Sequence, residues 1–284
     1  MILLIKRIFV GVTVLLIAVT CLFAGCDNVG ILNGKGFEYK YGVFLGAEPE
    51  DVERMAAYEI LVVEGQAFSE REVSELKAAG HTIISYINVG SVEEYRPYYS
   101  DFEQYTLDVY EDWEDEKWID VTVPEWQEFI VNNLAADLKN KGFDGLFVDN
   151  VDVYYHYHTD EVFDSLTYML KSFKSIEFYV SVNGGDEYVT EYMDRNGSLN
   201  ELIDAVNQET VFSKIIWDET DTFDVQDDEE RRYFQKYLSE VHKQGVDVYL
   251  LEYSKDEDLI ADVKDYCDKK GYYYYVSSTL NLEA

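Results

Sequence analysis

Short apolar runs alternate with longer amphipathic segments from residue 41 onward. Runs rich in Val, Ile, Phe and Tyr predict eight strands, at residues 41–46, 60–65, 82–89, 145–150, 178–183, 205–210, 246–253 and 272–277. The segments between them have helical periodicity, as in 69–79, 125–141, 161–174, 199–203, 227–244 and 256–270. Parallel neighbours need a crossover connection, so this alternation predicts a parallel sheet with helices packed against it.

Glycine ends three of the predicted helices directly before the next strand, at Gly80, Gly142 and Gly245. Glycine adopts the left-handed conformation that terminates a helix without a side-chain clash. Eight strand–helix units can close into a barrel, which would pair every strand edge. We therefore predict an α/β fold, a (β/α)8 TIM barrel in a single domain. A doubly wound open sheet is the alternative, although no glycine-rich phosphate loop follows the first strand.

The connection between the third and fourth predicted strands, residues 90–144, is unusually long. It contains Trp113, Trp118 and the apolar run 118–123 ahead of the helix that begins at residue 125. Long ordered loops are commonly functional, so we expect short elements of its own near the mouth of the barrel.

The first 25 residues differ from the rest of the chain. Lys6 and Arg7 precede an uncharged apolar run, 8–25, which ends in Ala24-Gly25 before Cys26. This arrangement resembles a bacterial lipoprotein signal, so we predict a signal peptide at 1–25, lipidation of Cys26, a tether at 26–39 and the barrel at 40–284. The protein would be anchored in the bacterial cell envelope, outside the cytoplasm. An ordinary cleaved signal or a retained membrane anchor is the alternative.

The amino-acid composition and net charge limit which kinds of molecule the protein could bind. There are 57 acidic and 23 basic side chains, and the formal net charge of −34 disfavours nucleic acid, because phosphate would be repelled. A hydrophobic content of 47% supports a folded core, and three cysteines exclude a disulfide framework. We expect a monomer without a cofactor. His156 and His158, near Asp149, could suggest a metal site, but we interpret them as loop residues and predict none.

Polar side chains end most of the predicted strands, and in a barrel these ends converge on one mouth. The residues concerned are Glu64, Tyr86, Asn88, Asp149, Asn150, Asn183, Asn207, Glu209, Glu252 and Tyr253. Unpaired carboxylates are costly in apolar surroundings, so their recurrence at one end of the strands indicates a site.

Asp149 and Glu209 are the two carboxylates that could carry chemistry. Each follows an apolar strand, and the two strands are separated by one other in the chain. Cleavage of a glycosidic bond uses such a pair, in which one acid loses its proton and the other keeps one for the leaving oxygen. Both could equally be strand-end caps or members of salt bridges, and position alone leaves the two interpretations open.

Four segments together resemble the endo-α-1,4-polygalactosaminidase family, glycoside hydrolase family 114. They are 143–152 (FDGLFVDNVD), 84–91 (ISYINVGS) followed by 94–96 (EYR), 113–121 (WEDEKWIDV) and 206–209 (VNQE). They occur in the family's order, and the likeness covers about residues 40–280. The resemblance implies a TIM-barrel glycosidase of an α-linked amino-sugar polymer, with Asp149 as nucleophile and Glu209 as general acid/base. Retention of configuration would then require carboxyl groups about 5–5.5 Å apart.

The remaining strand-end residues, together with Asp120 of the 113–121 segment, are predicted to bind substrate. Trp113, Trp118, Tyr154, Tyr155 and Trp217 could stack on sugar rings or simply pack in the fold. The acidic charge fits a cationic polysaccharide, although it could also be an ordinary solvated surface. Two alternatives remain, a non-catalytic polysaccharide-binding lipoprotein and a barrel enzyme of unrelated chemistry.

Overall fold

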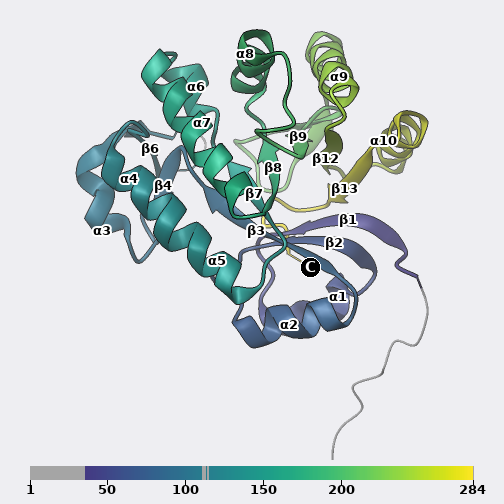
Figure 1. Cartoon of the computed structure of the whole chain (residues 1–284). Coiled ribbons are helices and arrows are strands. Elements are labelled where there is room, and N and C mark those ends of the chain that lie inside the picture. Colours follow the sequence, from purple (N-terminus) through teal and green to yellow (C-terminus); the bar gives the residue numbers. More distant parts are fainter. Residues whose placement is uncertain (1–35, 111–112, 114, 284) are drawn as a thin grey trace, which may run out of the picture. The chain divides into compact units, whose positions relative to one another are not determined.

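Eight parallel strands form the inner layer of the computed structural model, which describes residues 36–110, 113 and 115–283. The contacts group Gly36–Ala284 into a single unit. Helices lie around the outside of the strands (Figure 1), and the predicted (β/α)8 TIM barrel is confirmed. All eight predicted strands are present, in the order β1 (Tyr39–Phe44), β2 (Tyr58–Val63), β3 (Thr82–Asn88), β7 (Gly145–Asp149), β8 (Tyr179–Asn183), β9 (Ala205–Glu209), β12 (Asp247–Tyr253) and β13 (Tyr273–Ser277).

The barrel is nearly closed. Parallel ladders join each strand to the next from β1 to β13. Within the described ranges no ladder joins β13 back to β1, which corrects the expectation that every strand edge is paired. Side-chain packing holds this seam instead, because the rings of Phe44 and Tyr275 meet edge to face with centroids 5.2 Å apart.

Helices cross between most of the barrel strands. Their starts follow local sequence signals, for Ser69 and Glu72 form a reciprocal capping box at α2, and the side chain of Asp256 caps α10. Gly80, Gly142 and Gly245 have positive φ angles, as predicted for helix ends. The helices are α1 (Val52–Met55), α2 (Glu70–Ala78), α3 (Tyr99–Phe102), α4 (Pro124–Glu128), α5 (Ala136–Lys141), α6 (Val153–His156), α7 (Asp160–Ser175), α8 (Asp186–Asn196), α9 (Asp228–Lys243) and α10 (Glu257–Lys270).

One predicted helix is wrong. Residues 199–203 form turns, in which the amides of Leu202 and Ile203 both donate to the carbonyl of Leu199. The crossover helix between β8 and β9 is α8, which begins directly after Gly185 and is capped at its end by Gly197. The apolar residues of 199–203 are buried, so their spacing reflects core packing rather than a helical face.

Two insertions rise from the carboxyl ends of the strands. The long connection after β3 contains an antiparallel sheet of β4 (Ser91–Glu93), β6 (Glu116–Ile119) and β5 (Thr106–Val109), as its length led us to expect. A π-helical stretch, Phe129–Ala135, then joins α4 to α5. After β9, the strands β10 (Ser213–Ile215) and β11 (Phe223–Val225) form a hairpin.

The core has two layers because side chains alternate across each strand. On β2, Ile60 and Val62 pack in the barrel interior, whereas Leu61 and Val63 pack beneath the helices. The interior ends in polar side chains at the carboxyl end of the barrel, where the candidate site lies.

The predicted signal peptide at 1–25, Cys26 and most of the tether at 26–39 lie outside the described residues. At the end of that tether, β1 begins at Tyr39, two residues before the predicted strand at 41–46 and one before the predicted start of the barrel at residue 40. No helix in the described part of the chain is long and apolar enough to cross a membrane.

Gly90 provides a test of how tightly the ends of β3 and β7 meet. A Cβ atom on Gly90 would lie 1.8 Å from the carbonyl oxygen of Asn150. We expect Gly90→Ala to lower the free energy of unfolding by about 1–3 kcal/mol or more, because the backbone must shift. Urea denaturation measures the change. Gly36→Ala is the control, since nothing lies within 4 Å of its Cβ position, and equal stability of the two variants would contradict the prediction.

Candidate active site

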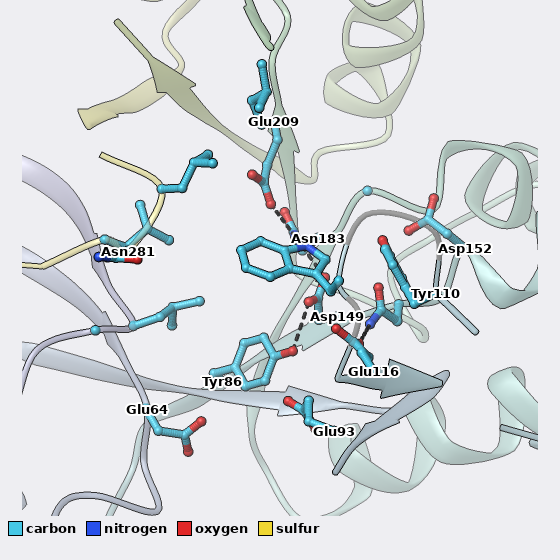
Figure 2. Close-up of a pocket in the computed structure, with 18 of the residues that line it drawn as sticks. Glu64, Tyr86, Glu93, Tyr110, Glu116, Asp149, Asp152, Asn183, Glu209 and Asn281 are labelled. Carbon is cyan, nitrogen blue, oxygen red and sulfur yellow. Dashed lines mark hydrogen bonds between the residues drawn. The ribbon is translucent and has the colours of Figure 1, made fainter. Parts of the chain in front are cut away.

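A cleft of about 720 Å³ opens at the carboxyl ends of the barrel strands. Asp149 and Glu209, the two predicted catalytic carboxylates, point into it from β7 and β9 (Figure 2). The strand between them, β8, ends in Asn183. Parallel pairing of β7, β8 and β9 therefore brings three predicted site residues together.

The side-chain amide of Asn183 bridges the two carboxylates. Its Nδ2 donates to Asp149 Oδ1 and to Glu209 Oε1, each at 2.8 Å. Since both oxygens lie 2.8 Å from one nitrogen, they can be no farther apart than twice that distance. The two acids thus lie close together in the same cleft, and neither is held in an ion pair within the described residues.

A tyrosine hydroxyl donates a hydrogen bond to the second carboxylate oxygen of each acid. Tyr86 donates to Asp149 Oδ2 at 3.0 Å, and Tyr253 donates to Glu209 Oε2 at 2.6 Å. Both tyrosines come from barrel strands, β3 and β12, that flank the central three. Each carboxylate is therefore fixed by one amide hydrogen and one phenol.

A relay behind Asn183 fixes which way its amide points. Asn207 Nδ2 donates to Asn183 Oδ1 at 2.7 Å, and the hydroxyl of Tyr41 donates to Asn207 Oδ1 at 3.0 Å. With its oxygen engaged in this way, Asn183 presents its NH2 group to the acids. Tyr41 and Asn207 are buried, so the relay lies below the cleft.

Burial and mutual charge set the protonation of the pair. Burial raises the pKa of both acids, and hydrogen bonds from Asn183 and the tyrosines lower it. The negative charge of Asp149 further raises the pKa of Glu209. Because the two carboxylates lie close together, ionisation of one disfavours ionisation of the other.

Backbone strain follows each acid. Asn150 and Thr210, the residues directly after Asp149 and Glu209, have φ angles of 60° and 54°. A β-branched residue is rarely found there, and such outliers cluster at functional sites. Both left-handed residues end their strand immediately beyond the carboxylate.

Additional acids line the cleft. Burial, together with the charges of Glu93 and Asp149, raises the pKa of Glu116 to about 7, although a hydrogen bond from Ser91 lowers it. Burial likewise raises the pKa of Asp152 to about 7. Among the described residues that line the cleft, Arg96 is the one with a basic side chain. Its guanidinium group forms ion pairs with Glu64 at 2.9 Å and with Glu93 at 2.8 Å.

Not every predicted substrate-binding residue reaches the cleft. Those that line it are Glu64, Tyr86, Asn150, Asn183 and Tyr253. Four others do not, which corrects their predicted placement. Asn88 is buried and donates to Glu116 at 2.9 Å, Asn207 belongs to the relay, and the Asp120 carboxylate accepts from the backbone and hydroxyl of Thr122.

Glu252 is the fourth residue placed away from the cleft. It is fully buried, and its carboxylate accepts from the backbone amides of Val211, Phe212 and Ser213 and from the Ser213 hydroxyl. Burial raises its pKa to about 7, against the lowering effect of these bonds. Glu252 therefore anchors the loop that follows Glu209. Its position at a strand end is correct, but its side chain turns to the other side of the strand.

Of the aromatic candidates, Trp113 and Trp217 line the cleft. They are 43% and 46% exposed, and their rings meet at 5.8 Å. Trp118 and Tyr154 are buried and Tyr155 lies outside the cleft lining, so these three belong to packing or to other surfaces. His156 and His158 take part in no group that could hold a metal ion among the residues described.

Several residues that line the cleft were not among the predicted site residues. They are Glu93, Tyr95, Arg96, Tyr110, Glu116 and Asp152. Most lie in the connection after β3 rather than at a barrel strand end. The sequence features that could have indicated them are the length of that connection and the many acidic and aromatic residues in it.

Comparisons with known proteins bear on the family and the fold of the chain. The family profile of glycoside-hydrolase family GH114 matches residues 27–280. The chain is 26% identical over 240 residues to uncharacterized protein MJ1477 of Methanocaldococcus jannaschii, covering 76% of this chain and 66% of that protein, just under two thirds of its length.

Two solved structures share the fold. The glycoside hydrolase domain of PelA from Pseudomonas aeruginosa superposes with a TM-score of 0.72 at 19% identity, covering 86% of this chain and 96% of that one. Ega3 of Aspergillus fumigatus, solved in complex with galactosamine, gives 0.67 at 15% identity, covering 90% of this chain and 97% of that one.

Replacing the bridging amide should affect both acids together. We expect Asn183→Ala to raise the pKa of Asp149 and of Glu209 further, because each anion loses a hydrogen bond. Carboxyl carbon NMR titration measures both values. The control is Asn281→Ala, which removes an amide from the same cleft without touching either acid. A shift confined to one carboxyl group would show that Asn183 does not bridge them.

Proposed function

The chain belongs to glycoside-hydrolase family GH114, and on that premise we propose that it hydrolyses an α-linked, galactosamine-type polysaccharide by a retaining mechanism. Family membership makes it a glycosidase. The observation that carries the mechanism is the amide of Asn183, which donates to both carboxylates at 2.8 Å.

The spacing of the acids supports retention. Retaining glycosidases hold their carboxyl groups about 5–5.5 Å apart, whereas inverting enzymes hold them about 6.5–9.5 Å apart to admit a water molecule. Two oxygens that each lie 2.8 Å from one nitrogen can be no farther apart than twice that distance, which is short of the range of inverting enzymes. The bridge therefore favours direct attack by one acid over activation of water between them.

In the proposed course, Asp149 attacks the anomeric carbon while Glu209 gives its proton to the glycosidic oxygen. The bond to the leaving sugar breaks and an ester to Asp149 forms. Glu209, now ionised, takes a proton from water, whose oxygen attacks the same carbon and releases Asp149. The negative charge of Asp149 raises the pKa of Glu209, which supports Glu209 as the proton donor.

The hydrogen-bond partners are expected to hold the acids in attacking geometry. Tyr86 and Asn183 occupy both oxygens of Asp149, which limits its rotation. Tyr253 does the same for Glu209. Positioning of this kind lowers the barrier because the reacting groups need not be ordered during the reaction.

The substrate class rests on charge and on the family. Galactosamine residues carry ammonium groups, and the cleft is lined by more carboxylates than basic groups. A protein of net charge −34 would also draw a cationic polymer toward this cleft.

Loss of either acid should abolish turnover. We expect Asp149→Asn and Glu209→Gln each to lower hydrolysis of an α-1,4-galactosamine polymer about a thousandfold or more, with the circular dichroism spectrum unchanged. Mass spectrometry of products from the full-length protein measures turnover, and proton NMR of the first product reports its anomeric configuration. N-acetylated and neutral galactose polymers serve as controls.

Three outcomes would refute parts of this proposal. Unchanged turnover in either variant would remove that residue from the mechanism, and an inverted first product would exclude the ester. Binding of the polymer without any product would favour the alternative, a non-catalytic polysaccharide-binding protein.

We further propose that the mature protein is anchored to the membrane by lipid on Cys26, outside the cytoplasm. The support is the apolar run 8–25 that ends at Ala24-Gly25-Cys26. Mass spectrometry of protein purified from bacterial membranes should find an acylated Cys26 as the first residue, and Cys26→Ser should abolish that modification. An unmodified residue 26 in an intact chain would contradict the anchor.

A further inference from the structure

Two buried glutamates oppose each other beside the catalytic pair. Glu93 on β4 and Glu116 on β6 are directly paired in the antiparallel register. Side chains so paired project to the same face, and like charges there are destabilising. Both line the cleft, and they are only 5% and 8% exposed. The fold thus places two neighbouring acids where water cannot fully solvate them.

The residues next to this pair in the chain form an ordinary ion pair outside the cleft. Glu94, adjacent to Glu93, binds Lys117, adjacent to Glu116, at 2.7 Å. Glu94 is absent from the cleft lining. A lysine therefore complements the acid outside the cleft, whereas the side toward the cleft has glutamate on both strands.

The side chains around Glu93 and Glu116 neutralise the two negative charges only in part. Arg96 binds Glu93 Oε1, but the same guanidinium is shared with Glu64. Glu93 Oε2 is buried and accepts no hydrogen bond from the described residues. Glu116 Oε1 accepts from Ser91, from Asn88 at 2.9 Å and from Asn150 at 2.7 Å, and none of these donors carries a charge. A buried carboxylate oxygen without a donor costs free energy unless a ligand supplies one.

We propose that Glu93 and Glu116 form a subsite that binds the primary ammonium group of an amino sugar. An ammonium group brings a positive charge and three donors, which is what two adjacent carboxylates with one unused buried oxygen require. A metal ion fits less well, since no group of three ligating side chains is found in the described part of the chain.

The subsite lies next to the point of cleavage. Asn150, which donates to Glu116, directly follows Asp149 in the chain, and Figure 2 shows Glu93 and Glu116 on the same side of the cleft as Tyr86 and Asp149. The ammonium group would therefore belong to a sugar unit at or beside the bond that is cut. This inference rests on the proposed function and names the groups by which the cleft would tell an amino sugar from a neutral one.

Glu116→Gln is the discriminating variant. Glutamine keeps an oxygen for the three donors around Oε1 and removes one negative charge without changing shape. In the absence of sugar we expect its Tm to rise by roughly 1–4 °C, because the repulsion with Glu93 is lost. A purely structural glutamate would give the opposite sign. Glu94→Gln is the matched control, with the same substitution one residue from Glu93 but outside the cleft lining.

Binding is measured by calorimetry with D-galactosamine and D-galactose, at a pH at which the amine is protonated. The full-length protein should prefer galactosamine by about tenfold or more, Glu116→Gln should lose most of that preference, and Glu94→Gln should keep it. Glu93→Gln, which leaves Glu116 in place, is a second test should Glu116→Gln fail to fold.

The outcomes separate this inference from the proposed function. Preference for galactosamine that depends on Glu116, in a protein that cleaves no polymer, would support the subsite and refute the hydrolase mechanism. Cleavage with an undiminished preference in Glu116→Gln would refute the subsite alone. Equal binding of the two sugars by the full-length protein would overturn the subsite, as would binding of Ca²⁺ or Mg²⁺ at these glutamates in place of the sugar.

Discussion

One amide group governs the geometry of the active site. Asn183 ends the strand between those that carry Asp149 and Glu209, so its NH2 group reaches an acid on either side. An amide turned the other way would present its oxygen to two carboxylates and repel both. The relay from Tyr41 through Asn207 prevents this by occupying the Asn183 oxygen. A buried phenol at the bottom of the barrel thereby determines how two acids meet at its mouth.

The cleft contains several features that lower the stability of the folded protein. Asp149 and Glu209 are each followed by a residue with positive φ, and acids with raised pKa values line the same cleft. Each feature costs free energy in the free protein, and the well-packed two-layer core of the barrel must offset that cost. A cationic substrate would relieve the electrostatic part of it, so binding and strain are linked in one region.

The long connection after β3 adds acidic side chains to the cleft that the barrel strands do not supply. The barrel strands supply Asp149, Glu209 and the residues that hold them, whereas the small antiparallel sheet supplies Glu93 and Glu116. Asn150 joins the two parts, since its side chain donates to Glu116 and its backbone follows Asp149. The proposed chemistry and the proposed recognition of the amino sugar thus belong to different parts of the same cleft.

The sequence alone determined the eight strands and the positions of Asp149 and Glu209, because apolar period and strand ends are local properties of the chain. It could not place Glu252 in a buried loop anchor or assign Asn183 to both acids at once, since those contacts depend on which strands are neighbours. The pairing of Glu93 with Glu116 is likewise a matter of register between segments more than twenty residues apart. A pattern of residues shows which side of a backbone is apolar, but only the tertiary structure decides which polar atoms come within hydrogen-bonding distance.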